Sequence, residues 1–138
     1  MKIDLYLPER LQQRIDSKRQ RLEELEAEST AIGSLAVTDE KVMSSPPGGA
    51  RFEEVLFRKM VVEKEIQHLL LKKTEVVEEI LKVAWQLSFD EQDLIIMRYI
   101  NLRLITDIAD TLNVSYRTVQ RRLKTAKQHF QEAEDNVL

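Results

Sequence analysis

The residues with the clearest chemical potential in this sequence are the cations within "DTLNVSYRTVQRRLKTAKQ", residues 110–128. The net charge of the chain is −3, yet residues 114–130 contain five basic side chains and no acid. These side chains are Arg117, Arg121, Arg122, Lys124 and Lys127. Arginine can donate paired hydrogen bonds to guanine, and lysine contacts phosphates. The stretch therefore suits binding of a nucleic acid, although a charge run is also typical of a solvated helix face.

Other reactive side chains are sparse. The absence of cysteine excludes disulfides and thiolate metal sites. His68 and His129 are far apart in the sequence, and two isolated histidines without cysteine do not form a zinc site. There is no phosphate-binding glycine loop and no paired nucleophile and base. We therefore expect no enzyme activity, no metal and no cofactor.

The spacing of the basic residues indicates a helix over about residues 116–130. At 3.6 residues per turn, one side of this helix is apolar and consists of Val119, Leu123, Ala126 and Phe130. The opposite side is polar. Together with the polar residues at the helix start, it provides the candidate DNA-binding residues Ser115, Tyr116, Arg117, Thr118, Gln120, Arg121, Lys124 and Gln128. Ser115 is also a favourable N-cap, because its hydroxyl can accept a free N–H of the first turn.

The elements that must position this helix lie directly before it. Ser88 and Glu91 have the spacing of a capping box, so a helix should begin near Phe89 and continue to Ile100. A short helix is expected at about residues 104–112, followed by Asn113, which tolerates left-handed backbone geometry. A short helix, a tight turn and a longer basic helix form the layout of a helix-turn-helix, whose second helix enters the DNA major groove.

The N-terminal part has apolar seams at helical spacing. A helix is expected over about residues 8–36, and "SSPPGG" predicts a loop over residues 44–50. A second helix is expected over about residues 51–87. Its apolar residues follow a heptad pattern of Val55, Val62, Ile66, Leu69, Val76, Ile80, Val83 and Leu87. Such a pattern predicts coiled-coil packing. The first helix is the obvious partner, in an antiparallel hairpin, and a second copy of the chain is the competing one. Because the second helix is longer and has the wider apolar stripe, oligomer contacts or docking of the C-terminal domain could cover the rest of it.

Taken together, the expected fold class is all-α, with two domains. Residues 1–84 would form the long, coiled-coil-like helical hairpin, and residues 85–138 the helix-turn-helix domain. No stretch of the sequence is apolar for long enough to span a membrane, and the N-terminus lacks the layout of a signal peptide. We expect a cytoplasmic protein with no membrane partner.

The segment "EQDLIIMRYI…ITDIADTLNVSYRTVQRRLKTAKQHF" resembles region 4 of sigma-70 factors. The whole arrangement looks still more like the ArpU/RinA-type late-gene regulators of phages and prophages. This resemblance implies a transcriptional activator that binds double-stranded DNA through a sigma-like helix-turn-helix, with RNA polymerase as a further candidate partner. Two positions depart from the family pattern: Leu104 replaces a small polar cap, and the order Arg122–Leu123 reverses the usual apolar and polar residues.

Two other functions remain open at the level of the sequence. A small terminase-like DNA packaging subunit also combines a helix-turn-helix with helical assembly segments. A structural or protein-binding coiled coil could instead dock its basic helix on an acidic partner. In the leading interpretation the hairpin oligomerises or contacts RNA polymerase. A homo-oligomer would carry two DNA-binding modules, which would raise the effective concentration on DNA.

Overall fold

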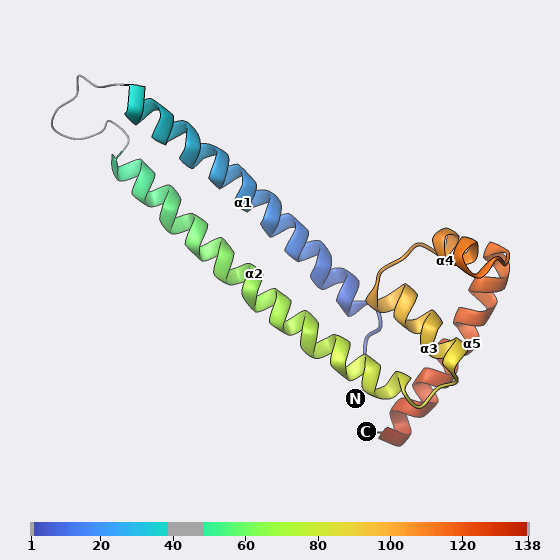
Figure 1. Cartoon of the computed structure of the whole chain (residues 1–138). Coiled ribbons are helices and arrows are strands. Elements are labelled where there is room, and N and C mark those ends of the chain that lie inside the picture. Colours follow the sequence, from blue (N-terminus) through green and yellow to red (C-terminus); the bar gives the residue numbers. More distant parts are fainter. Residues whose placement is uncertain (1, 39–48, 138) are drawn as a thin grey trace. The chain divides into compact units, whose positions relative to one another are not determined.

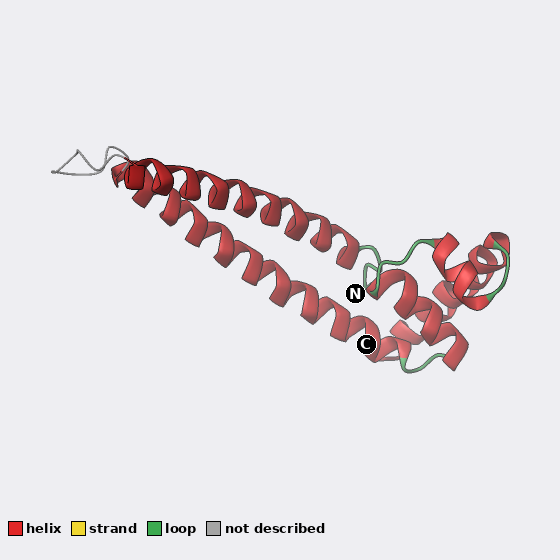
Figure 2. Ribbon diagram, turned by 45° about the horizontal axis from the view of Figure 1, so that its top comes forward, coloured by secondary structure: helices red, strands yellow, loops and turns green. Residues whose placement is uncertain are grey.

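The computed structural model describes residues 2–38 and 49–137, and every regular element in these two ranges is helical (Figures 1 and 2). The elements are α1 (Leu7–Thr38), α2 (Gly49–Ala84), α3 (Phe89–Ile95), the π-helical turn η1 (Ile96–Ile100), α4 (Ile105–Leu112) and α5 (Tyr116–Val137). The expected all-α fold class is therefore confirmed. Among the described residues, no helix has the combination of length and apolar character that crossing a membrane requires.

The ends of α2 differ from the expected ones. The helix begins at Gly49, so residues 49–50 of the expected loop are helical, while residues 44–48 lie outside the described part of the chain. It ends at Ala84 instead of Leu87. The chain turns there because the N–H of Leu87 donates to the carbonyl of Ala84, at 2.9 Å. The buried amide of Gln92 then donates to the Leu87 carbonyl, at 2.8 Å.

The contacts of the chain divide it into two compact units. One is Gln13–Leu71, and the other combines Met1–Gln12 with Lys72–Leu138. The sequence pattern had suggested a boundary after residue 84. In the structure, residues just before α1 and the end of α2 share a buried core with α3, α4 and α5.

Within Gln13–Leu71, α1 and α2 lie side by side (Figure 1). Their shared core is an apolar cluster of Ile15, Leu25, Val55, Val62 and Ile66. Three ion pairs border this cluster: Glu28 with Arg51, Glu26 with Lys59, and Lys18 with Glu65. Partner numbers rise along α2 as they fall along α1, so the two helices run in opposite directions.

The second unit has a core of its own, which the end of α2 helps to build. Ile80, Val83 and Ala84 are buried there with Leu5, which precedes α1. The remaining members come from α3, η1, α4 and α5 and include Ile95, Tyr99, Ile108, Val119 and Phe130. The heptad pattern of α2 correctly marked Ile80 and Val83 as buried. However, outside α2 the buried members of this core are Leu5 and residues of the C-terminal part of the chain.

Three backbone features lie at the joints between the last helices. In η1 the N–H of Asn101 donates to the carbonyl of Ile96, at 2.8 Å, which closes a wider turn than that of an α-helix. Leu102 then has a φ of 57°, a strained conformation for a residue with a branched side chain. Asn113 has a φ of 55° and ends α4 in left-handed geometry, which asparagine tolerates well.

Candidate nucleic-acid interface

The turn between α4 and α5 is fixed by local hydrogen bonds. Past the end of α4, the N–H of Val114 donates to the carbonyl of Ala109, at 3.0 Å, while Asn113 adopts its left-handed geometry. At the start of α5, the N–H of Thr118 donates to Oγ of Ser115, at 3.1 Å. The Ser115 hydroxyl also contacts Oγ1 of Thr118, at 2.8 Å. Ser115 is thus the N-cap that the sequence predicted.

The two sides of α5 differ in burial as the helical spacing predicted. Val119, Leu123, Ala126 and Phe130 are all buried. The candidate DNA-binding residues are exposed, apart from the half-buried Thr118: these are Ser115, Tyr116, Arg117, Gln120, Arg121, Lys124 and Gln128. Sequence reasoning placed the end of this helix near residue 130. In the structure, α5 continues to Val137 because Ala133 and Glu134 are also buried against the core.

The basic side chains on the exposed side of α5, Arg117, Arg121 and Lys124, form no ion pairs within the part of the chain that the structure describes. These three side chains are one helical turn apart, so they point in the same direction from α5. A polyanion that lies along this helix would therefore meet arginine and lysine donors that no carboxylate already occupies.

The two departures from the family pattern have simple structural consequences. Leu104 is 63% exposed and makes no side-chain cap, and α4 starts at Ile105 with its first turn closed by the backbone of Leu104. Leu123 is buried and Arg122 is exposed. The order of this pair therefore agrees with the direction of the apolar face of α5. Arg122 borders a groove with Asp90 and Asp93 of α3, on a different flank of α5 from Lys127.

Beside the exposed side of α5 lies a basic pocket that sequence reasoning missed. Its volume is about 300 Å³, and its lining includes three cations and no carboxylate. The polar and aromatic lining residues are Tyr6, Arg98, Tyr99, Gln120, Lys124 and Lys127. Arg98 and Tyr99 lie in the segment that resembles region 4 of sigma-70 factors, but nothing in the sequence indicated that residue 6 would lie beside residue 127.

The aromatic pair of this pocket is held by packing and by charge. The rings of Tyr6 and Tyr99 meet edge to face, with centroids 5.6 Å apart. Lys127 Nζ donates to the hydroxyl of Tyr6, at 3.2 Å, and lies 4.7 Å from the centroid of its ring. This hydrogen bond lowers the pKa of the Tyr6 phenol from its usual value. Burial raises the pKa of Tyr99 to about 12, so its phenol stays neutral at ordinary pH.

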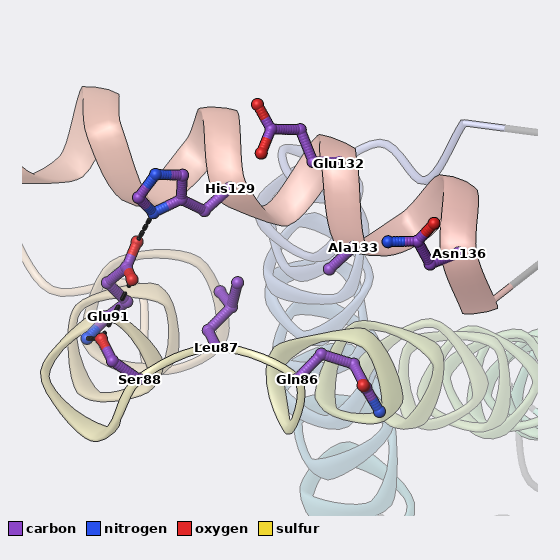
Figure 3. Close-up of a pocket in the computed structure, with 8 residues that line it drawn as sticks. All are labelled: Gln86, Leu87, Ser88, Glu91, His129, Glu132, Ala133 and Asn136. Atoms are coloured by element: carbon purple, nitrogen blue, oxygen red, sulfur yellow. Dashed lines mark hydrogen bonds and ion pairs between the residues drawn. The ribbon is translucent and has the colours of Figure 1, made fainter.

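A second, polar hollow of about 310 Å³ lies between the end of α2, α3 and the C-terminal half of α5 (Figure 3). Glu91 is engaged there: it accepts a hydrogen bond from Ser88, at 3.0 Å, and its Oε2 lies 2.5 Å from Nδ1 of His129. The first half of the expected capping box is present, because the N–H of Glu91 donates to Oγ of Ser88, at 3.4 Å. The Glu91 carboxylate contacts the Ser88 hydroxyl and His129 instead of the Ser88 N–H.

No cluster of three or more histidine or acidic residues suited to a metal occurs within residues 2–38 and 49–137. Comparison of the chain with models of protein families, with curated proteins and with solved structures finds no match. A function is therefore inferred from the arrangement of the residues themselves.

Proposed function

We propose that this protein is a sequence-specific DNA-binding transcriptional regulator of the phage or prophage type. In this proposal, α4, the turn at Asn113 and α5 act as a helix-turn-helix, and α1 and α2 act as a coiled-coil-like arm. The observation that carries it is the exposed side of α5. Arg117, Arg121 and Lys124 lie in one row on it, free of ion pairs within the described residues, while the opposite side is buried.

The N-terminal half of α5 would lie in the major groove. Arg117 and Arg121 would donate to base edges, and Gln120 and Gln128 would read bases beside them. Lys124 would contact a phosphate, and Ser115, Tyr116 and Thr118 would bind phosphates at the start of the helix. The free N–H groups and positive dipole end there favour the same anions.

The test is selection of bound fragments from source DNA, including phage or prophage DNA, followed by titration of a selected site. Arg117→Ala and Arg121→Ala should each weaken specific binding by about 1–3 kcal/mol. Arg122→Ala removes the same charge from another flank of α5 and should weaken specific binding less. If the three variants bind the selected site equally well, the assigned DNA-contacting side is wrong. Selected sites at promoters support a regulator, whereas sites at a packaging locus support a terminase-like subunit.

We also propose that the protein acts as a homo-oligomer. Phe57 and Met60 of α2 are 66% and 55% exposed, one helical turn apart. Glu53 precedes them and Lys64 follows them at the same helical spacing. An antiparallel second copy would place Phe57 on Met60 and Glu53 beside Lys64, so the surface is complementary to itself in shape and charge. RNA polymerase is a further candidate partner, as in the family that the sequence resembles.

A further inference from the structure

We propose that the basic pocket formed by Tyr6, Arg98, Lys124 and Lys127 is a phosphate-binding site. The phosphate would come from the backbone of bound DNA or from a free phosphate ligand. The first source rests on the proposed DNA-binding function, and the second does not. In either case the segment before α1 would take part in binding, although it is more than a hundred residues away from α5 in the sequence.

The pocket has a positive charge that suits an anion. Arg98, Lys124 and Lys127 line one hollow together with hydroxyl and amide groups, and no carboxylate lines it. None of the ion pairs within residues 2–38 and 49–137 involves any of these three cations. Three cations at close range repel one another, and a bound anion relieves that repulsion. A phosphate offers the oxygen acceptors that guanidinium and ammonium groups bind best.

Arg98 is held in place without a ligand. Arg98 lies in η1, and π-helical turns of this kind occur frequently at functional sites. Its Nη1 donates to the carbonyl of Arg103, at 3.0 Å. Arg103 in turn is fixed by the hydroxyl of Thr111 and, at 3.3 Å, by the carbonyl of Asp107. One of the five guanidinium N–H groups of Arg98 is used in this way, so the other donors remain for a ligand.

Tyr6 belongs to the segment before α1, and contacts of this segment fix its position. The N–H of Tyr6 donates to Oδ1 of Asp4, at 2.9 Å, and Asp4 also pairs with Arg10. The N–H of Ile3 donates to the buried carboxylate of Glu134 in α5. These contacts tie the segment to the rest of its unit.

The chemistry of the Tyr6 hydroxyl completes the site. Its oxygen accepts from Lys127, which leaves the phenolic O–H as a donor toward an anion in the pocket. The same ammonium lowers the pKa of the Tyr6 phenol, and a more acidic O–H is a stronger donor. Lys124 and Gln120 line the pocket and also belong to the exposed side of α5. A phosphate in the pocket would therefore lie next to that side.

The experiment has a DNA arm and a free-phosphate arm, both with the full-length chain. In the DNA arm, the slope of log affinity against log salt is measured for Lys127→Gln and for the matched control Arg122→Gln. Lys127→Gln should lose one phosphate contact, which lowers the magnitude of the slope by about 0.9. Arg122→Gln should lose none, so its slope should equal that of the unchanged protein. Tyr6→Phe retains the ring and should weaken DNA binding without change in the circular dichroism spectrum.

In the second arm, inorganic phosphate is titrated and the Arg98 side-chain N–H signals are followed by NMR. Saturable shifts that Lys127→Gln abolishes would support a free-phosphate site, even if no DNA binds and the proposed function fails. A different outcome is that DNA binds, that Lys127→Gln and Tyr6→Phe bind it like Arg122→Gln, and that phosphate causes no NMR shift. The pocket is then not a phosphate site, while the proposed function stands. Failure of both DNA and phosphate binding would overturn both proposals.

Discussion

Ile80 gives a direct test of how the exposed side of α5 is supported. The heptad pattern placed this residue in the seam between the two long helices. The structure buries it completely in the core of the Lys72–Leu138 unit, with residues of α3 and α5. Ile80→Ala should therefore destabilise α5, which lies far from residue 80 in the sequence.

The size of the effect follows from burial. The substitution removes three carbon atoms, worth about 0.8 kcal/mol each, or about 2.4 kcal/mol in total. The cavity left among rigid neighbours adds to this, so we expect a loss of about 3–4 kcal/mol in the free energy of unfolding. Leu69→Ala is a matched control, because it also removes three carbons but from a half-buried side chain in the other unit. Water can refill that position, and the expected loss there is about 1 kcal/mol.

The assay is urea unfolding combined with backbone amide hydrogen exchange. In Ile80→Ala, protection of the buried part of α5 should fall by about two orders of magnitude or more, because 1.4 kcal/mol corresponds to a factor of ten. In Leu69→Ala, protection in α5 should change little. Unchanged protection of α5 in Ile80→Ala, or an equal loss in both variants, would refute the assignment of Ile80 to the C-terminal core.

Three further predictions concern domain boundary, helix cap and assembly. A fragment of residues 85–138 should give a broad, weakly cooperative melt in circular dichroism, because it lacks four buried core residues; a sharp melt would show that it folds alone. Those residues are Leu5, Ile80, Val83 and Ala84. Ser115→Ala should cost about 0.5–2 kcal/mol in a urea titration, since the N–H of Thr118 loses its acceptor, and Ser115→Thr should restore most of it. Phe57→Glu should halve the mass found by light scattering; an unchanged mass would exclude this face of α2 as the interface between copies.

Much of the candidate site could be predicted from the sequence, because it depends on local helix geometry and capping. The period of 3.6 residues determines which side of α5 is apolar, because helix geometry alone sets the directions of Val119 and Arg117. Ser115 as N-cap and Asn113 as the left-handed residue depend only on neighbours within a few positions. These features need no contact with distant residues, so one stretch of the chain is enough to predict them. The buried side of α5, the N-cap at Ser115 and the left-handed geometry of Asn113 were all confirmed.

The tertiary structure decided which elements meet. A heptad pattern shows that Ile80 will be buried, but apolar surfaces are interchangeable, so it cannot show that α3 and α5 cover it. The basic pocket depends on contacts across the whole chain: Tyr6 meets Lys127, and the N–H of Ile3 reaches Glu134. The helical turn at Arg98 is widened to a π-helical one within the packed unit, which no local propensity indicated. Local periodicity therefore determined the faces of the helices, whereas packing between distant segments determined the pocket beside them.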